Sequence, residues 1–359
     1  MGGGGVCVGW GGDNEWVGVV SGGGGVLMSW SALVSGGNRG IGLEVVRSLL
    51  AQAPSGATIF LGCRDLVAGT ALAATLAQPG SASECVAVQL DVTDAASIAA
   101  AVDAVGAAAP HLSCLVNNAG IMPEAVSPEF KLDAVRETMA TNFGGAVVAV
   151  TTAFLPLLLK APENSASVLS VSSGVGARTM GLLSPEHRDA VSAPELDDAH
   201  LAERFEALTE EIGADPDHPY RSSIPTVVSD NFPVLSSSVS LRAQLRAPFL
   251  PRSAYRPTRA LPQGYGLSKA AVNCYTQLLA ARQPTLRVNA CSPGFTNTDM
   301  CLGYTGTRQP KEVPLGASVF AKVIFGDLGA GKTSTFFKEA SKAGVPLAEA
   351  TSVVDAWVQ

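Results

Sequence analysis

Short apolar segments alternate with longer segments of helical pattern from Ser31 to about Val171, and this alternation constrains the fold more than any other feature. The expected strands are residues 32–34, 58–63, 86–90, 112–116 and 167–171. The expected helices are residues 43–50, 66–77, 97–106 and 132–159, the last as two successive stretches. Strands that lack polar alternation are buried on both faces, which is typical of a parallel sheet covered by helices. The sequence therefore predicts an α/β fold, a doubly wound Rossmann-type parallel sheet in a single domain.

A glycine-rich loop separates the first expected strand from the first expected helix. It reads Ser35-Gly36-Gly37-Asn38-Arg39-Gly40-Ile41-Gly42. Its glycines permit a tight turn and let backbone N–H groups approach a pyrophosphate. The N-terminus of the following helix attracts the same anion. Other glycine clusters occur in the chain, so it is the position between a strand and a helix that favours a phosphate site here.

The end of the second expected strand bears on the choice of cofactor. A dinucleotide-binding sheet that takes NAD usually places an acid here for the ribose 2′-hydroxyl, whereas an arginine suits the 2′-phosphate of NADP. The chain has Arg64 followed by Asp65. Arg64 and Arg39 together are able to pair with a phosphate, although Asp65 offers Arg64 an acid to bridge instead. The sequence favours NADP.

Tyr265 and Lys269 are spaced four residues apart in Tyr265-Gly266-Leu267-Ser268-Lys269. This spacing places both side chains on one face of a helix. A nearby ammonium favours the phenolate and is expected to lower the pKa of Tyr265. A tyrosine of this kind exchanges a proton with a carbonyl or an alcohol oxygen. Alone, the pair is common on solvated helix faces, so the motifs that precede it decide its meaning.

Further motifs follow the expected strands in order. They are Asp91-Val92 after the third strand, Asn117-Asn118-Ala119-Gly120 after the fourth, Asn142 in a helix, Ser173 after the fifth, and Ser292-Pro293-Gly294-Phe295 with Thr298 after the sixth. With the glycine loop and the Tyr265–Lys269 pair, these motifs resemble those of the short-chain dehydrogenase/reductase family, particularly its carbonyl reductase-like branch. Ser35 stands where the family has Thr. The resemblance runs from about Ser31 to the C-terminus, with one interruption.

The resemblance implies NADPH-dependent reduction of a ketone, aldehyde or quinone to the alcohol. Tyr265 would donate the proton, and Lys269 would lower its pKa and hold the nicotinamide ribose. Ser173 would hydrogen-bond to the substrate oxygen, and Asn142 would anchor a water linked to Lys269. The implied cofactor contacts are Ser35, Gly36, Asn38, Arg39, Gly40, Ile41, Gly42, Arg64, Asp91, Val92, Asn118, Ala119, Gly120, Tyr265, Lys269, Pro293, Gly294 and Thr298. Two alternatives stay open: an NADP-dependent alcohol dehydrogenase in the oxidative direction, and a non-catalytic NADP-binding scaffold.

The interruption is an insertion, expected at residues 178–262, that separates Ser173 from Tyr265. Residues 185–219 are acidic and have a helical stretch near residues 201–212. Residues 221–262 hold many Arg, Ser and Pro and one acid, a composition typical of a loop or of disorder. In members of the resembled branch an insertion covers a surface used for tetramer formation, so the resemblance implies a monomer.

The chain is expected to divide into residues 1–30, a Gly-rich disordered tail, and residues 31–359, the NADP-binding catalytic domain. A translation start at Met28 is an alternative. Residues 16–38 are uncharged, but Gly22 to Gly25 interrupt them, so a membrane span is not expected. The formal net charge of −7 gives no general attraction to nucleic acid or to an anionic membrane.

Cysteine and histidine usage point to a reducing compartment and to no metal. The seven cysteines are scattered, without a C-x-x-C, so neither a disulfide framework nor a zinc site is indicated. The four histidines are not spaced as metal-ligand pairs. A cytoplasmic location is expected, with an organelle as the alternative if the true N-terminus differs. The expected partner is a small carbonyl compound.

One motif competes with this interpretation. Residues 326–333 fit the phosphate-binding pattern G-x-x-x-x-G-K-[ST] in full. That pattern needs a strand before it and a long helix after it. Here residues 315–325 are expected to be helical and residues 335–337 to form a strand, so ATP binding is not expected.

Overall fold

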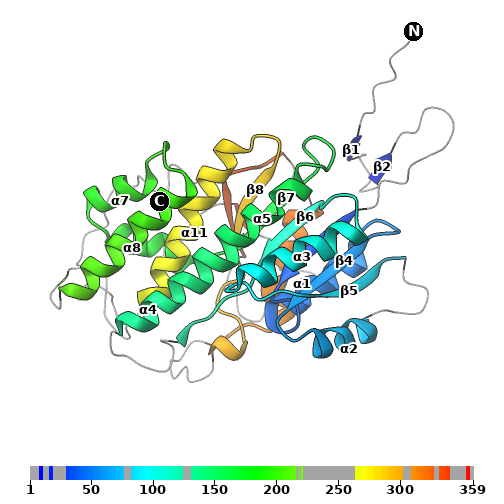
Figure 1. The fold of residues 1–359 in the computed structure, drawn as a ribbon, viewed down its shortest axis with the longest axis horizontal. Coiled ribbons are helices and arrows are strands. Elements are labelled where there is room, and N and C mark those ends of the chain that lie inside the picture. Colours follow the sequence, from blue (N-terminus) through cyan, green and yellow to red (C-terminus); the bar gives the residue numbers. More distant parts are fainter. Residues whose placement is uncertain are drawn as a thin grey trace, which may run out of the picture.

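The structure is a computed structural model that describes residues 8–10, 16–18, 30–76, 82–123, 131–215, 218, 220, 263–301, 309–326, 331–339 and 353–355. An eight-stranded sheet in the order β10-β9-β8-β7-β6-β3-β4-β5 forms its centre (Figure 1). The strands are β3 (Ser31–Ser35), β4 (Thr58–Cys63), β5 (Glu84–Gln89), β6 (Cys114–Asn117), β7 (Ser167–Val171), β8 (Arg287–Ser292), β9 (Thr335–Glu339) and β10 (Val353–Asp355). Neighbouring strands from β5 to β9 run parallel, and β10 pairs antiparallel with β9.

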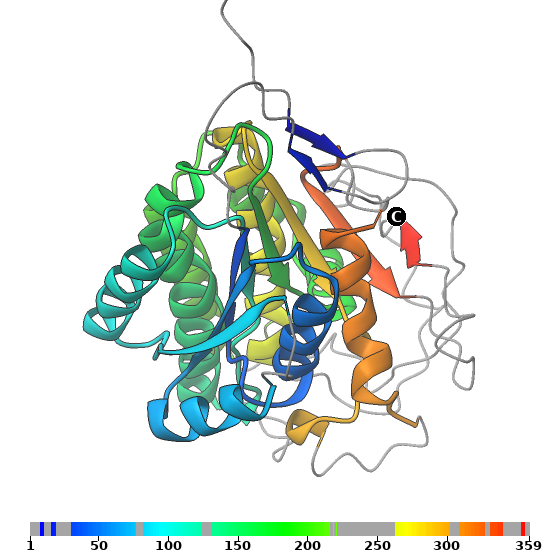
Figure 2. The same ribbon diagram turned by 90° about the vertical axis from the view of Figure 1, so that its right-hand side faces the viewer.

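Helices cover both faces of this sheet (Figures 1 and 2). One face is covered by α3 (Ala95–Ala108), α4 (Leu132–Met139), the widened helical segment η2 (Ala140–Ala149), α5 (Val150–Leu158) and α11 (Gln263–Arg282). The other face is covered by α1 (Gly40–Gln52) and α12 (Val313–Ile324), with α2 (Leu66–Leu76) at its edge. The remaining described helices are α6 (Gly174–Leu182), α7 (Pro185–Ser192), α8 (Asp198–Ala214) and the short η4 (Asp299–Cys301).

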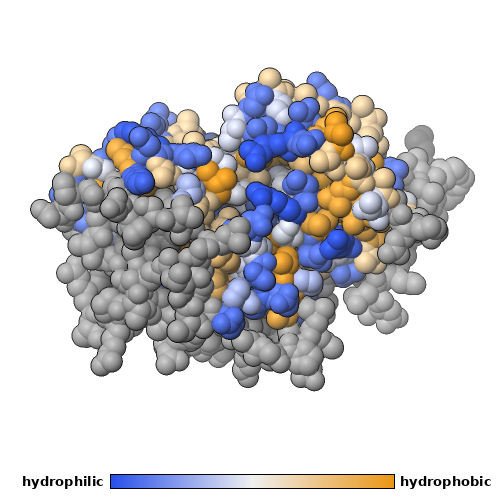
Figure 3. All heavy atoms as spheres, turned by 90° about the horizontal axis from the view of Figure 1, so that it is seen from below, coloured by the Kyte–Doolittle hydropathy of each residue, from blue (hydrophilic) through white to orange (hydrophobic). Residues whose placement is uncertain are grey.

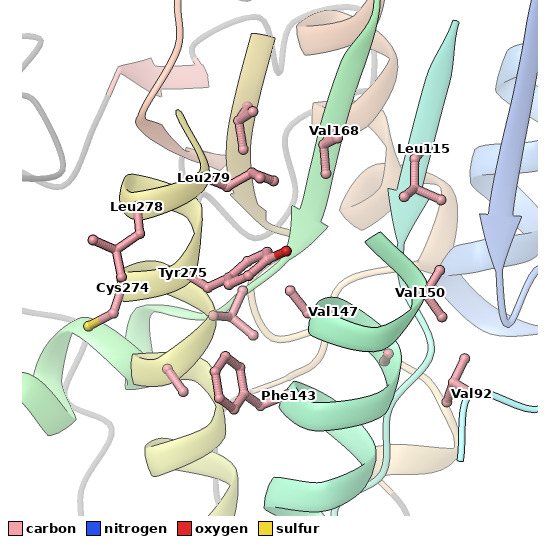
Figure 4. Close-up of a cluster of buried hydrophobic side chains, with 14 of the residues drawn as sticks. Val92, Leu115, Phe143, Val147, Val150, Val168, Cys274, Tyr275, Leu278 and Leu279 are labelled. Atoms are coloured by element: carbon pink, nitrogen blue, oxygen red, sulfur yellow. The ribbon is translucent and has the colours of Figure 1, made fainter. Parts of the chain in front are cut away.

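The apolar strands are buried because successive side chains enter the two layers alternately. Leu33 pairs in register with Phe60 and Leu115 and belongs to the core on the α11 side. The next residue, Val34, belongs to the core on the α1 side. Figure 4 shows the first core, where Phe143 and Tyr275 fill the space between η2 and α11. Strands β3, β4, β6 and β7 are therefore buried on both faces, as the continuous apolar runs predict, whereas the edge strand β5 is partly exposed.

The chain reverses direction across the sheet between β3 and β6. From β3 it builds β4 and β5 on one side, and then crosses back to β6 on the other. Such a switch point opens a crevice at the carboxyl ends of the strands, where ligands bind in open α/β sheets. Ser35 and Asn117 end the two strands at this point.

The predicted doubly wound single domain is confirmed. The structure also assigns helices to the described part of the insertion, whose expected start at Arg178 falls inside α6, and α8 contains the expected helical stretch 201–212. The loop or disorder predicted for residues 221–262 lies outside the described residues. Within residues 1–30 the structure describes Trp30 and two short antiparallel strands, β1 (Val8–Trp10) and β2 (Trp16–Gly18). The predicted disorder of the rest of that segment, and the alternative start at Met28, also lie outside it.

Residues 132–158 form one helical stretch that is long and apolar enough to cross a membrane by length and composition. More than half of its most apolar window is buried in the fold, as in the core helix of a globular domain. On the face shown in Figure 3, hydrophilic and hydrophobic residues gather in small, interspersed groups over the described part of the chain.

Candidate active site

The glycine loop occupies the switch point at the end of β3. Gly36 and Gly40 have positive φ angles of 62° and 54°, which other residues adopt at a cost. A Cβ on Gly42 would collide with the carbonyl oxygen of Gly36, so the loop closes tightly on itself. Arg39 precedes α1, and its side chain makes no capping hydrogen bond to the first turn. The helix N-terminus therefore has no side-chain cap and suits a bound anion.

Two of the predicted cofactor residues hold the loop together instead of projecting from it. Ser35 Oγ accepts hydrogen bonds from the N–H groups of Asn118 (3.0 Å) and Ala119 (3.1 Å). Asn118 Nδ2 donates to the carbonyl oxygens of Ser35 (2.9 Å) and Gly36 (3.1 Å). These bonds fasten the glycine loop to the segment after β6. The polar side chains of Ser35 and Asn118 thus shape the floor of the site.

The charged residues expected to select the cofactor, Arg39 and Arg64, are exposed at the rim of the candidate site. Arg39 Nη1 forms an ion pair with Asp299 Oδ2 at 2.6 Å, and both side chains are about two-thirds exposed (67% and 65%). Arg64 is exposed at the end of β4. Hydrogen bonds from the Thr93 side chain and N–H group lower the pKa of Asp91, and the charge of Arg64 acts in the same direction. Val92 is buried behind Asp91.

Asn142 lies where the helix between α4 and α5 widens. The segment η2 is a π-helix, a rare form that often marks functional sites. Asn142 Oδ1 accepts from the N–H of Ile121 at 2.7 Å, and Nδ2 donates to the carbonyl oxygen of Ile121 at 2.9 Å. Nδ2 also lies 3.2 Å from Ser268 Oγ in α11. Asn142 therefore connects the segment after β6 to the helix that contains Tyr265 and Lys269.

The structure brings Ser173, Tyr265 and Lys269 together. Ser173 caps α6, and its side chain hydrogen-bonds to the hydroxyl of Tyr265. Lys269 Nζ lies 5.5 Å from the centroid of the Tyr265 ring and donates to the carbonyl oxygen of Val171 at 2.7 Å. The hydroxyl groups, the ammonium and the glycine loop all lie at the carboxyl edge of the sheet.

The expected direction of the Tyr265 pKa is wrong in this structure. Burial raises the pKa of Tyr265 to about 12, and the hydrogen bond from Ser173 offsets only part of that rise. Burial also lowers the pKa of Lys269 to about 8. The ammonium is directed at the Val171 carbonyl oxygen rather than at the phenol, so loss of water around the phenol outweighs its attraction. Both groups are driven toward their neutral forms.

Close packing of α6 on α11 explains how Ser173 reaches Tyr265 across the insertion. A Cβ on Gly176 in α6 would lie 2.5 Å from the backbone carbon of Lys269. A Cβ on Gly266 in α11 would collide with Thr179 Oγ1 in α6. Two glycines facing each other's helix let the backbones approach closely. Direct contact between α6 and α11 thus brings Tyr265 to Ser173, although the two residues are 92 positions apart in the sequence.

The segment after β8 closes over the glycine loop. Pro293 is buried, and Gly294 has a positive φ of 75°. Thr298 lies next to Gly40, with its methyl carbon 3.5 Å from the position of a Cβ there. Asp299 adds its ion pair to Arg39. Thr298 and Asp299 thus lie beside the loop, and Pro293 and Gly294 begin the segment that leads to them. That Pro293, Gly294 and Thr298 contact a cofactor stays a prediction.

In the described part of the chain, the competing phosphate-binding pattern at residues 326–333 lacks the flanking strand and long helix that an ATP-binding loop needs. Its described residues lie between α12 and β9 rather than between a strand and a long helix. The carbonyl oxygen of Lys332 accepts from Asn289 Nδ2 at 2.9 Å, and Thr333 Oγ1 accepts from the Val288 N–H at 3.0 Å. These residues fasten the turn to β8. Asp327 to Ala330 lie outside the described residues.

The sequence analysis did not identify the residues that connect the candidate catalytic groups. Ser268, the Val171 carbonyl group and Gly176 were not singled out, although each contacts Asn142 or Lys269. Ser268 lies between Tyr265 and Lys269, so its position next to the motif could have identified it. Gly176 in α6 could not be identified in this way, because Lys269, which it packs against, is 93 positions away.

Comparison with known proteins finds similarity to short-chain dehydrogenases and reductases. The family profile described as short chain dehydrogenase matches residues 31–185. "Short-chain dehydrogenase/reductase 1" of Saponaria officinalis is 30% identical over 292 residues, covering 76% of this chain and 83% of the relative. "Carbonyl reductase [NADPH] 1" of Homo sapiens is 29% identical over 290 residues, covering 78% and 86%. The structure of salutaridine reductase from Papaver somniferum superposes with a TM-score of 0.60 at 22% identity, covering 86% of this chain and 99% of that one.

Proposed function

This chain belongs to the short-chain dehydrogenase family, and on that premise we propose that it reduces the carbonyl group of a ketone, aldehyde or quinone with NADPH. The observation that supports this proposal most is the hydrogen bond between Ser173 and Tyr265 at the carboxyl edge of the sheet. Two hydroxyl groups that share a hydrogen bond are able to converge on one substrate oxygen. The human relative is named a carbonyl reductase that uses NADPH.

The residues present fit a dinucleotide. The uncapped N-terminus of α1 follows the glycine loop and suits the pyrophosphate. Arg39 and Arg64 lie at the rim where a ribose 2′-phosphate would be recognised. Asp91 and Val92 would face the adenine, and Gly120, Pro293, Gly294 and Thr298 would border the nicotinamide half. When bound, NADPH supplies the hydride.

The protein's own groups would handle the proton and the developing charge. Tyr265 is protonated at neutral pH because its pKa is about 12, so it would donate its proton to the carbonyl oxygen. Ser173 would donate a second hydrogen bond to the same oxygen and stabilise the alkoxide as it forms. Lys269 would hold the ribose, and Asn142 would keep α11 in register with the strand ends.

Burial keeps the phenol of Tyr265 protonated near neutral pH, and this is the form that reduction of a carbonyl requires. Oxidation of an alcohol by the same residues stays the alternative, and the ratio of NADPH to NADP decides between the two directions. An NADP-binding scaffold without activity has no need for Ser173, Tyr265, Lys269 and Asn142 together, so we rank that alternative last.

A single chain is the proposed active unit. Helix α8 lies on α4 and α11, where Arg136 forms an ion pair with Glu210 at 2.6 Å and the rings of Phe143 and Phe205 lie 5.9 Å apart. These contacts occupy the helix surface through which family members without an insertion are expected to associate. Light scattering at the mass of one chain supports this, and a tetramer would contradict it. A cytoplasmic location stays a prediction.

Incubation with NADPH and a panel of aldehydes, quinones and diketones tests the activity. Loss of NADPH absorbance with at least one class, matched by formation of the alcohol, is the expected result. A purified, folded protein that consumes no NADPH with any class would exclude the reductase and leave the scaffold.

A further inference from the structure

One side chain of the insertion, Tyr220, reaches the catalytic helices. It is 1% exposed, and its hydroxyl oxygen lies 3.4 Å from Thr179 Oγ1 in α6. The same oxygen would lie 3.1 Å from a Cβ on Gly266, the residue that follows Tyr265 in α11. Tyr220 therefore fills the junction between α6 and α11.

This junction lies beside both catalytic hydroxyl groups. Val175 in α6 also lies close to the Cβ position of Gly266, at 3.5 Å. The N–H of Val175 donates to Ser173 Oγ at 3.2 Å. One side of the junction thus holds Ser173 and the other holds Tyr265. Protein interiors are packed densely enough to transmit small displacements, so the group that fills the junction affects the separation of the two hydroxyls.

We propose that Tyr220 is a positioning residue that keeps α6 and α11 at the separation which lets Ser173 hydrogen-bond to Tyr265. It acts through Thr179 and Gly266 and does not touch the reacting atoms. The kinetic tests of this inference rest on the proposed reductase function, whereas its structural test does not. It makes the insertion part of the catalytic apparatus, because the insertion supplies the side chain that sets the geometry.

Three side chains of the insertion hold Tyr220 in place. One carboxylate oxygen of Glu211 in α8 lies 3.0 Å from Nε2 of His187 in α7. The other lies 3.5 Å from Nε2 of His218. The N–H of Tyr220 donates to Nδ1 of His218 at 3.1 Å. The imidazole that contacts Glu211 therefore also fixes the backbone of Tyr220.

The same trio has the donor atoms of a zinc site, and its geometry argues against one. The three ligand atoms lie within 4.8 Å of one another. Because Nδ1 of His218 accepts a hydrogen bond from Tyr220, the neutral ring has its proton on Nε2. A metal would bind the lone pair of Nε2, and the ring proton would then have to lie on Nδ1. Two N–H groups, those of Nδ1 and of Tyr220, would then face each other and the hydrogen bond would be lost. The trio is a hydrogen-bonded clasp.

Removing the Tyr220 hydroxyl tests the inference, with Tyr275→Phe as the matched control. Tyr275 is equally buried on α11, and its hydroxyl contacts Thr151 and Thr152, away from the junction. Tyr220→Phe should lower kcat for carbonyl reduction roughly 3- to 10-fold, with KM for NADPH within about twofold, because small misplacements of catalytic groups are costly. Tyr275→Phe should stay within about twofold in both constants.

The split between kcat and KM separates positioning from mere stabilisation. The hydrogen bond from Ser173 acts to lower the pKa of Tyr265, so loosening it alters the group that donates the proton and leaves the cofactor contacts intact. Glu211→Ala, at a half-exposed position, should release the clasp and lower kcat in the same way, again with KM for NADPH within about twofold. Variants that lower only Tm, with wild-type kcat, overturn the inference.

Two readouts do not depend on activity. Crystal structures of wild type and Tyr220→Phe should show Ser173 Oγ and Tyr265 Oη within hydrogen-bonding distance in the first and further apart in the second. An unchanged separation overturns the inference, whatever the activity. A wild type that reduces no carbonyl refutes the proposed function and leaves this structural comparison valid. Zinc should not raise the Tm of the wild type; a rise that Glu211→Ala abolishes would refute the hydrogen-bonded clasp.

Discussion

The ammonium group of Lys269 donates a hydrogen bond to the carbonyl oxygen of Val171 at 2.7 Å. This bond joins α11 to the end of β7, two residues before Ser173, and so connects the two halves of the candidate active site. Lys269 is only 4% exposed, and burial lowers its pKa to about 8. The same burial raises the pKa of Tyr265 to about 12. The site thus holds its phenol as an acid and its lysine close to deprotonation at neutral pH.

The stability of the protein should depend on the state of Lys269. Between about pH 8 and pH 10.5 the unfolded lysine still binds its proton, whereas the folded one has released it. The unfolded state binds more protons in this window, so this group makes the free energy of unfolding rise with pH there. Below pH 8 the full cost of burying the ammonium is present. The gain across the window is on the order of 1–3 kcal/mol.

Urea unfolding of wild type and Lys269→Met at pH 7.5 and pH 9.5 measures this effect. The difference between the two proteins is the relevant quantity, because cysteines with raised pKa values, such as Cys85 and Cys114, also titrate in alkaline solution. The wild type should gain stability relative to the variant as the pH rises. Equal pH dependence in both proteins would mean that the pKa of Lys269 is not lowered.

Because α6 and α11 approach closely at Gly176, a larger residue at this position should lower both the stability and the activity of the protein. The Cβ of Gly176→Ala would lie 2.5 Å from the backbone of Lys269, so the helices must separate. We expect a loss of roughly 1–3 kcal/mol in the free energy of unfolding and a fall in kcat. Gly181→Ala is the control on the same helix, because no atom lies within 4 Å of its Cβ position. It should be neutral or stabilising. Equal effects of the two substitutions would contradict the packing account.

The ion pair between Arg39 and Asp299 should affect the choice of cofactor. Both side chains are exposed, so the pair adds little to stability, but it competes with a 2′-phosphate for Arg39. Arg39→Ala should raise KM for NADPH about 10-fold or more and change KM for NADH by less than about twofold. Asp299→Asn should lower KM for NADPH, because Arg39 is then free for the phosphate.

Steady-state kinetics with both cofactors check these cofactor effects, and Arg64→Ala should behave like Arg39→Ala. Arg47→Ala is the control, since Arg47 is an exposed arginine on α1 that pairs with Glu44 rather than with Asp299. It should leave both KM values unchanged. Parallel changes for NADPH and NADH in Arg39→Ala would show that Arg39 does not recognise the 2′-phosphate, and the same result in Arg64→Ala would show it for Arg64.

The layered fold was predictable because the central parallel strands β3, β4, β6 and β7 are buried on both faces. An apolar run such as residues 58–63 has few other places to lie in a chain of this composition. The Tyr265–Lys269 spacing likewise places both residues on one helix face without reference to the rest of the chain. The predicted cofactor and catalytic residues are near one another because the ends of parallel strands meet at one edge of the sheet.

What the sequence could not predict depends on contacts between distant segments. The pKa of Tyr265 rises because the phenol is buried, and burial is a property of the packed fold. The roles of Ser35 and Asn118 depend on hydrogen bonds between two strand ends some 80 residues apart. The clasp of His187, Glu211 and His218 forms only when α7 folds back on α8.

A single-turnover experiment with NADPH deuterated at the transferred C4 position tests the central claim most directly. With a carbonyl substrate found in the panel, the wild type should place deuterium on the carbinol carbon of the product. Tyr265→Phe, which keeps the ring and removes the acid, should do so at a rate lower by on the order of 10²-fold or more. A product without deuterium, or transfer by Tyr265→Phe at the wild-type rate, would contradict hydride reduction with Tyr265 as the proton donor.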